Sequence, residues 1–199
     1  MPDYILEQEL TAKGYTAICG VDEAGRGPLS GPVVAAACIL PIGLYIEGLN
    51  DSKKLSPKKR DALFDVIREE AIAYAIASAS PAEIDELNIL NATMLAMRRA
   101  VAALSIPADF ALVDGNIARD FNIPTQTVIK GDAISASIAA ASILAKVTRD
   151  RLCEEDDALY PEYQFAKHKG YSTALHMDIL RRIGPSPIHR RSFLKFLKK

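Results

Sequence analysis

The sequence is poor in cysteine and histidine, with three residues of each among its 199. An odd number of cysteines excludes a fully paired disulfide framework, and their spacing is not that of a structural zinc site. Cys19 and Cys38 lie in apolar runs that are typical of strands. We therefore expect reduced, buried thiols in a cytoplasmic protein.

Long apolar runs, repeats and low-complexity segments are also missing. The longest apolar run, residues 33–40, is far too short to cross a bilayer. Residues 1–10 carry three acids and no base, unlike a secretory signal. Because no linker-like stretch divides the chain, we expect a single domain over residues 1–199. It would have a core at about residues 16–157 and a basic helical extension at about residues 158–199.

The chain as a whole has no excess of one charge sign, since its formal net charge is −1, but its charges are unevenly distributed. Residues 164–199 contain nine lysines or arginines and one acid, and residues 51–60 contain five and one. Such segments suit a surface that follows phosphates. A solvated face or a frayed tail is the more common explanation of a charge run.

Hydrophobic periodicity predicts an α/β protein in which strands and helices are mixed. We expect strands at residues 16–21, 31–40, 71–80, 110–113 and 125–129. Residues 71–80 could also be the tail of a helix, but the alternation of Ile72, Tyr74 and Ile76 favours a strand. Helices are expected to begin at Pro57 and to cover residues 91–104, 135–155 and 173–183. Ser80 and Glu83 form a capping-box pattern at the start of a further short helix.

Three of the predicted strands are followed by acids. Asp22 and Glu23 follow the first strand, Asp114 follows the fourth, and Asp132 follows the fifth after a short gap. Taken singly, Asp114 lies in a common turn dipeptide, Asp132 could cap a helix, and the first two could pair with Arg26. Ligands of open α/β sheets bind at strand ends, so the four carboxylates can converge. As a set they indicate a Mg²⁺ or Mn²⁺ site that works on a phosphate.

A glycine-rich turn follows the first two acids directly. In Gly25-Arg26-Gly27 the glycines allow a sharp bend and a close ligand, and the arginine offers a planar fork for phosphate. The phosphate loop of a nucleotide-binding protein is a weak alternative, because a strand follows and no Gly-Lys-Ser/Thr sequence is present.

The hydroxyl and imidazole groups near the end of the chain allow one more interpretation. A hydrolase triad of Ser192, His189 and Asp178 would need a nucleophile elbow, which the sequence lacks. We expect instead that the three histidines lie on the basic surface; they are His168, His176 and His189.

Six blocks of sequence resemble bacterial ribonuclease HII, the type 2 ribonuclease H family. In chain order they are Asp22-Glu23-Ala24-Gly25-Arg26-Gly27-Pro28, Asp51-Ser52-Lys53-Lys54-Leu55, Asp114-Gly115-Asn116, Lys130-Gly131-Asp132, Ala141-Ser142-Ile143-Leu144-Ala145-Lys146-Val147-Thr148-Arg149-Asp150 and His168-Lys169-Gly170-Tyr171. The matching region runs from about residue 16 to the end. The first and fifth blocks are highly specific, whereas the third is weak alone.

The resemblance implies an RNase H-like fold, with a five-stranded mixed sheet flanked by helices and a C-terminal helical extension. It implies an endoribonuclease that cleaves RNA paired with DNA. It also implies incision 5′ of single ribonucleotides in duplex DNA, leaving a 3′-hydroxyl and a 5′-phosphate, as ribonucleotide removal in DNA replication and repair requires. The expected cofactor is Mg²⁺ or Mn²⁺ in a two-metal mechanism. The expected partners are these nucleic acids, with no membrane, and the protein is expected to be a monomer.

The resemblance also assigns roles to single residues. The expected catalytic metal ligands are Asp22, Glu23, Asp114 and Asp132. The expected readers of the ribonucleotide 2′-hydroxyl, which is both donor and acceptor, are Gly25, Arg26, Gly27 and Tyr171. The candidates for substrate and phosphate contacts are Ser52, Lys53, Lys54, Lys146, Arg149, Lys167 and Lys169.

Alternatives remain open at this point. Lys146, Arg149 and Asp150 could equally hold a structural ion pair on one helix face, and Tyr171 could simply cover the last helix. Resolvases and exonucleases share such sheets and carboxylates, and a non-catalytic nucleic-acid binder is possible, although the intact acid set argues against it. Residues 193–199 alternate apolar and basic side chains and could dock on the body, clamp a duplex or meet a partner.

Overall fold

The computed structural model describes residues 1–198. Its strands are β1 (Ile18–Ala24), β2 (Val33–Ile39), β3 (Ala73–Ala79), β4 (Phe110–Asp114) and β5 (Thr125–Val128). Its α-helices are α1 (Ile5–Ala12), α2 (Pro57–Glu70), α3 (Pro81–Leu87), α4 (Ile89–Ala102), α5 (Ala136–Leu159), α6 (Phe165–His168) and α7 (Ala174–Ile183). Short 3₁₀ turns include η1 (Ser52–Lys54), η2 (Gly131–Ala133), η4 (Arg191–Phe193) and η5 (Lys195–Lys198).

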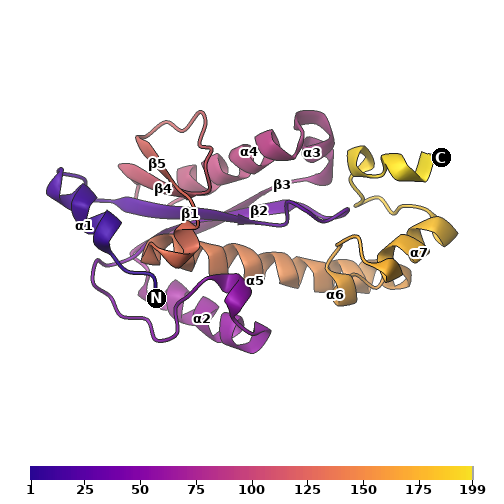
Figure 1. Ribbon diagram of the computed structural model, residues 1–199, viewed down its shortest axis with the longest axis horizontal. Helices are drawn as coiled ribbons and strands as arrows, with labels where there is room; N and C mark the ends of the chain where they lie inside the picture. The colour runs from indigo at the N-terminus through magenta and orange to yellow at the C-terminus, as the bar shows by residue number, and fades with distance from the viewer. Residues whose placement is uncertain (199) are drawn as a thin grey trace.

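A five-stranded mixed sheet forms the centre of the molecule (Figure 1). Its strand order is β3-β2-β1-β4-β5. Strand β2 runs antiparallel to β1 and β3, whereas β4 runs parallel to β1 and β5. All seven residues of β2 are buried, because helices cover both faces of the sheet at this strand. The five predicted strands are confirmed, with ends that differ by a few residues.

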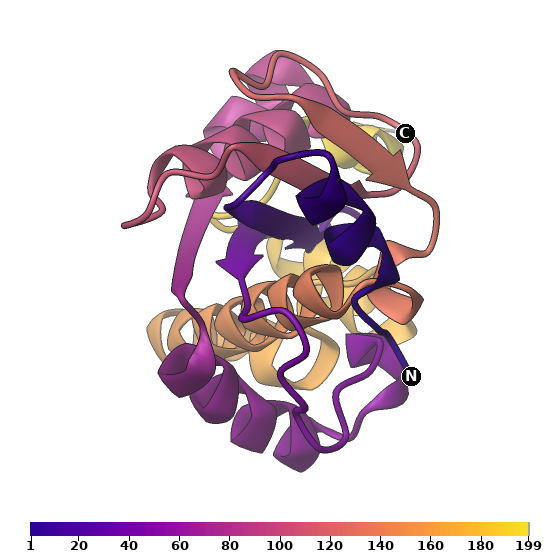
Figure 2. The ribbon, with the colours of Figure 1, turned by 90° about the vertical axis from the view of Figure 1, so that its left-hand side faces the viewer.

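The helices form one layer on each face of the sheet. On one face, α3 and α4 bury Ile84 and Met97 against Val33 and Ala35 of β2. On the other face, α5 packs on the sheet and α2 packs on α5, which Figure 2 shows as orange and purple helices below the strands. The capping box of α3 is present, since Ser80 and Glu83 exchange hydrogen bonds of 2.8 and 3.2 Å.

Helix α5 lies unusually close to β1. A Cβ atom on Gly20 would lie 2.1 Å from the carbonyl carbon of Ser137, so only glycine fits at this crossing. The alanines and serines in the first half of α5 are therefore matched by a glycine on the strand. The helix begins one residue later than expected and continues four residues further, to Leu159.

The C-terminal extension lies at the end of the molecule opposite α1 (Figure 1). It has its own apolar cluster, made of Leu29, Tyr163, Phe165, Ile179, Leu180 and Leu194. The Asp85 carboxylate accepts hydrogen bonds of 2.8 and 2.9 Å from the backbone amides of Arg191 and Ser192. The tail thus docks on the body as far as Leu194, which is buried; Lys199 lies outside the described residues.

Two further features concern the chain as a whole. Helix α1 was not predicted; it is held at the start of α5, where Glu7 accepts a 2.6 Å hydrogen bond from Ser135. Across residues 1–198, no helix is both long enough and apolar enough to span a membrane.

Candidate active site

Asp22, Glu23 and Asp114 gather where two central strands separate. Parallel pairing of β1 with β4 ends at Val21 and Val113, while β1 continues to pair with β2 as far as Ala24. Asp22 and Glu23 therefore lie inside β1, and the prediction that the strand ends before them is wrong. The early end of β4 leaves this side of β1 open beside Asp114, the last residue of β4.

Asp132 reaches the same place through a tight turn. Lys130 adopts a left-handed conformation with φ 57°, and η2 follows it. The backbone amide of Gly131 donates a 2.7 Å hydrogen bond to Oδ1 of Asp114, which joins the two acidic segments. Helix α5 is capped by Ser135 and not by Asp132, so the capping alternative is wrong.

The acids at the end of β1 are held in an environment that penalises their charge. Asp22 is 3% exposed. Burial raises its pKa well above the usual value, and the negative charges of Glu23 and Asp114 raise it further. Burial also raises the pKa of Glu23, although Arg26, whose guanidinium lies 3.4 Å away, lowers it. These carboxylates repel one another, and a bound cation would relieve that repulsion.

The residues present suit a divalent metal. All four acids supply oxygen donors, which Mg²⁺ and Mn²⁺ prefer. Asp22, Glu23 and Asp114 line one cleft, and Asp132 follows Gly131, whose amide is bonded to Asp114. Among residues 1–198, no three or more His, Cys, Asp or Glu side chains lie close enough together to hold a metal ion in the positions they occupy here. An arrangement of carboxylates around open space is what a site needs when substrate phosphate and water supply the remaining ligands.

A lysine faces the acids from the η1 turn. The Asp51 carboxylate accepts a 2.9 Å hydrogen bond from the Lys53 amide and so fixes the turn. Nζ of Lys53 lies 3.6 Å from Asp132, and this side chain is 77% exposed. Partial burial lowers the pKa of Lys53, but the charges of Asp132 and the neighbouring acids outweigh it and raise the pKa above its usual value. Burial, followed by the charge of Asp114, raises the pKa of Asp132.

Ser52 holds the same turn in place. It is buried, and its Oγ lies 2.9 Å from Oγ of Ser142 on α5. The prediction that Ser52 contacts substrate is not supported, because its hydroxyl is used within the protein. Ser142 was present in the fifth sequence block but received no role there; its partner could be found only from the fold.

The glycine turn and Tyr171 form the far wall of the cleft, which has a volume of about 280 Å³. Gly25 has a φ of 96°, a conformation that favours glycine. A Cβ atom on Gly27 would lie 3.5 Å from the ring of Tyr171, so the ring rests against this turn. Tyr171 is 45% exposed, so part of its ring is open to the cleft.

A buried arginine holds the turn from beneath. Arg190 is fully buried and donates hydrogen bonds to the carbonyl oxygens of Gly25 (2.6 Å), Arg26 (3.0 Å), Gly31 (2.9 Å) and Pro32 (3.2 Å). Burial, together with the nearby charge of Arg149, lowers its pKa to about 9. Sequence reasoning missed Arg190, because it appeared as one more charge in a basic tail.

Arg149 is a second buried arginine below the turn. It is 2% exposed and bonds to the carbonyl of Ser30 (3.2 Å) and to Sγ of Cys153 (2.7 Å). The prediction of a direct phosphate contact is therefore wrong for Arg149. Its positive charge still lies at the floor of the cleft and favours an anion above it.

The other basic candidates are distributed around the cleft and a neighbouring groove. Lys54 is largely exposed and lies 4.0 Å from Asp51. Lys146 lies 2.6 Å from Asp150, so the structural ion pair considered from the sequence is present. Lys169 lies 3.0 Å from Glu154, and Lys167 donates a 2.7 Å hydrogen bond to Gln164.

The three histidines are buried together, so the prediction of a surface location is wrong. The rings of His168 and His176 stack with centroids 4.0 Å apart, and Nε2 of His176 lies 3.0 Å from Nε2 of His189. Ser192 bonds instead to Asp85, and Asp178 to Arg182, which excludes the hydrolase triad. The thiols of Cys19, Cys38 and Cys153 are buried and unbridged, as expected for the first two.

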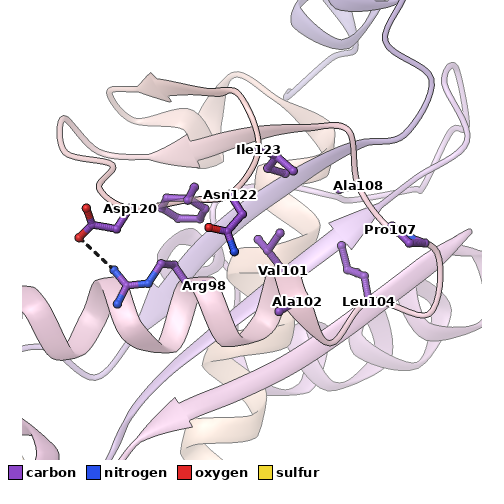
Figure 3. A pocket seen from close by; sticks show the side chains of 10 residues that line it. Arg98, Val101, Ala102, Leu104, Pro107, Ala108, Asp120, Asn122 and Ile123 are labelled. Carbon is purple, nitrogen blue, oxygen red and sulfur yellow. Dashed lines mark ion pairs between the residues drawn. The ribbon is translucent and has the colours of Figure 1, made fainter.

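A second cavity of about 190 Å³ lies between the end of α4 and residues 118–123 (Figure 3). Arg98 and Asp120, 3.6 Å apart, close one side of it, and apolar residues such as Val101 and Ile123 line the interior. None of the predicted site residues lines this cavity.

Known proteins agree with this arrangement. The sheet order, the flanking helices and the acids at the central strands define an RNase H-like nuclease, a hydrolase of nucleic acids. The solved structure of the ribonuclease H2 from Pyrococcus horikoshii OT3 superposes with a TM-score of 0.72 at 29% identity, covering 89% of this chain and 93% of that one. The family model described as Ribonuclease HII matches residues 19–196. The chain belongs to the ribonuclease HII family and is an RNase H endonuclease.

Curated relatives support the same assignment. A ribonuclease HII of Desulfitobacterium hafniense (strain Y51) is 61% identical over 187 residues, which cover 94% of this chain and 72% of the relative. A ribonuclease HII of Caldicellulosiruptor saccharolyticus is 55% identical over 190 residues, covering 96% of this chain and 93% of the relative. The family depends on divalent metal ions and acts on nucleic acid, which agrees with the donor set of the cleft.

Proposed function

We propose that this protein incises duplex DNA 5′ of a single ribonucleotide and also cleaves the RNA strand of longer RNA–DNA hybrids. The observation that carries the proposal is the position of Gly25–Gly27 and Tyr171 in the same cleft as the acids. Groups suited to sensing a 2′-hydroxyl would then act beside the groups that would hold the metal. We propose further that the protein is a monomer and that residues 1–199 act as one domain.

Four acids are proposed to hold the metal ions and to act in catalysis: Asp22, Glu23, Asp114 and Asp132. Mg²⁺ or Mn²⁺, when bound, would lower the pKa of water and offset charge on the leaving oxygen. Hydrolysis forms a bond between water oxygen and phosphorus and breaks the bond from phosphorus to O3′. A 3′-hydroxyl and a 5′-phosphate result.

The protein's own groups would orient the substrate around that step. Lys53 extends from η1 toward Asp132 and can approach a phosphate oxygen as negative charge develops. The amide of Gly131 fixes the rotamer of Asp114. The buried charges of Arg149 and Arg190 below the glycine turn favour the phosphate above it.

Recognition of ribose is assigned to Tyr171 and the glycine turn. A phenolic hydroxyl and backbone groups can both donate to and accept from a 2′-hydroxyl, which deoxyribose lacks. Arg26, half-exposed at the same turn, can bind the adjacent phosphate. Lys54, Lys146 and Lys169 are proposed to contact phosphates further along the duplex, with Lys146 and Lys169 first leaving their carboxylate partners.

The test uses two duplexes that differ by one oxygen atom. One is an all-DNA duplex, and the other carries a single ribonucleotide at a defined position. The purified protein is incubated with each duplex, with and without Mg²⁺ or Mn²⁺, and the ends of the products are mapped. We expect metal-dependent incision on the 5′ side of the ribonucleotide and no incision of the all-DNA duplex. Incision of both duplexes, or metal-independent incision, would reject the proposal.

A further inference from the structure

We propose that a buried chain of imidazoles, His189 to His176, positions Tyr171 and so sets the preference for a ribonucleotide. The inference rests on the proposed function, because it assumes that Tyr171 reads the 2′-hydroxyl. Both histidines act through Tyr171 and are positioning residues that do not touch the substrate themselves.

The hydrogen-bond partners fix the tautomer of each ring in this chain. The backbone amide of Ser186 donates to Nδ1 of His189 over 3.0 Å, so His189 carries its proton on Nε2. That Nε2–H donates to Nε2 of His176 over 3.0 Å, which leaves the proton of His176 on Nδ1. Nδ1–H of His176 then donates to the carbonyl oxygen of Tyr171 over 2.9 Å. Every bond in the chain therefore points toward Tyr171.

The third histidine supports the residues just before Tyr171. His168 accepts a 3.1 Å hydrogen bond at Nδ1 from the amide of Gly170, and its Nε2 donates to the carbonyl of Tyr163 over 2.7 Å. Its carbonyl oxygen accepts from the amide of Tyr171 over 2.9 Å. The ring stacks on His176 at 4.0 Å. Hydrogen bonds to His168 and His176 thus restrain the backbone of Gly170 and Tyr171.

Because the histidine rings are buried, each ring has one orientation in which its nitrogens are hydrogen-bonded. His176 is fully enclosed, and the aromatic rings of Tyr163 and Phe165 lie within 6 Å of the cluster. A buried polar group without its partner is costly, so each ring is confined to the orientation in which its nitrogens are bonded. The carbonyl of Tyr171 also accepts a 2.8 Å hydrogen bond from the amide of Thr173, so its backbone is fixed by two donors. The side chain of Tyr171 lies against Gly27.

Two substitutions of His176 separate positioning from packing. In His176→Asn the amide nitrogen can take the place of Nδ1 and keep the bond to Tyr171. In His176→Gln it takes the place of Nε2, and the bond to Tyr171 is lost. Both remove the ring, so both destabilise the extension. We expect His176→Gln to lower kcat/KM on the single-ribonucleotide duplex by about tenfold, the upper worth of one hydrogen bond, and His176→Asn by much less.

The matched control is Leu180→Ala in the same apolar cluster. Leu180 is buried, and its side chain makes none of the bonds described for Tyr171. This variant should lower the melting temperature without changing the ratio of kcat/KM between the single-ribonucleotide duplex and a long RNA–DNA hybrid. For His176→Gln, that ratio should fall.

Imidazole ¹⁵N chemical shifts at neutral pH test the chain without an activity assay. We expect His176 as the Nδ1–H tautomer, with His168 and His189 as Nε2–H tautomers. An Nε2–H tautomer for His176, or equal kinetics of the Asn and Gln variants, would overturn the inference. If Tyr171→Ala leaves the ratio of kcat/KM between the two substrates unchanged, the proposed role of Tyr171 in reading the 2′-hydroxyl is rejected. The ¹⁵N shifts still test the hydrogen bonds between the histidines and Tyr171 separately.

Discussion

At the scale of single residues, Asp22 is expected to lower the stability of the metal-free protein while being required for its activity. Its carboxylate is buried beside two other acids, and this burial raises its pKa. We expect Asp22→Asn to abolish cleavage, with a loss greater than the roughly 10- to 100-fold typical of residues that only support a metal ligand. In the absence of metal the variant should melt higher, since about 1 kcal/mol of relieved repulsion corresponds to roughly 2–4 °C for a chain of this size.

Circular dichroism melts and cleavage of an RNA–DNA hybrid with Mg²⁺ or Mn²⁺ measure the two effects of Asp22→Asn. Asp114→Asn is the companion variant and should be equally inactive. Near-normal turnover of either variant would remove that residue from the proposed metal site.

The two glycines of the turn predict different outcomes for the same substitution. A Cβ atom on Gly25 would lie 2.3 Å from Nε of Arg149, and the positive φ adds strain. On Gly27 its nearest neighbour is Tyr171, at 3.5 Å. Gly25→Ala should therefore lower the melting temperature by several degrees, a loss of about 1–3 kcal/mol. Gly27→Ala should leave it nearly unchanged, and equal melting temperatures would contradict this account of the turn.

Residue chemistry visible in the sequence accounts for part of the site. The four acids could be proposed as metal ligands because carboxylates after apolar runs have little structural use. Ser52, Arg149 and the histidines were misjudged because the sequence shows the type of a side chain but not its burial. From the sequence alone, a basic or imidazole side chain is expected at the surface. Arg190 and His176 are nevertheless buried, because segments distant in the chain pack around them.

At the scale of elements, the sequence predicted the five strands and most helices, because periodicity and caps are local. Helix α1 was missed since it has no capping side chain and is held by distant contacts such as Glu7 with Ser135. The end of β1 was misplaced because its last residues are paired only through β2. Pairing of that kind depends on register, which local sequence does not specify.

The segment that carries Arg190 is the element that ties the extension to the glycine turn. Arg190→Met would leave four carbonyl groups without their donor in a buried site. We expect the free energy of unfolding to fall by about 3 kcal/mol or more. The four carbonyl groups would remain buried without a hydrogen-bond donor, and leaving buried polar groups unpaired is costly. Urea denaturation measures this. Arg191→Met, at an exposed neighbour, is the control and should change little.

The histidine cluster makes the stability of the extension depend on pH. Burial lowers the pKa of His176 to about 4 and of His189 to about 3, against an ordinary value of 6.5. The unfolded chain therefore binds more protons than the folded one between these values, and stability rises with pH in this window. The raised pKa values of Asp22 and Glu23 act in the opposite sense, so the histidine effect is measured by comparison: as the pH is lowered from about 6.5 toward 4, the histidines should make the melting temperature of the parent protein fall relative to that of a variant without His176. His176→Asn should flatten this dependence, and an unchanged slope would contradict it.

At the scale of the whole molecule, the proposed metal site would couple metal binding to folding. The acids come from β1, β4 and η2, so a cation that binds them joins segments far apart in the chain. At a concentration 100 times its dissociation constant, Mn²⁺ should stabilise the folded protein by about 2.7 kcal/mol. Thermal melts against Mn²⁺ concentration measure the shift. Asp22→Asn should lose most of it, while Lys54→Met, directed at Asp51, should keep it.

The bond between Arg190 and the carbonyl of Gly25 joins residues 165 positions apart. Because a domain folds as a unit, the glycine turn can reach this form only after the segment that carries Arg190 has been synthesised, long after the residues of the turn itself. The proposed substrate-reading wall is therefore among the last parts of the protein to be completed.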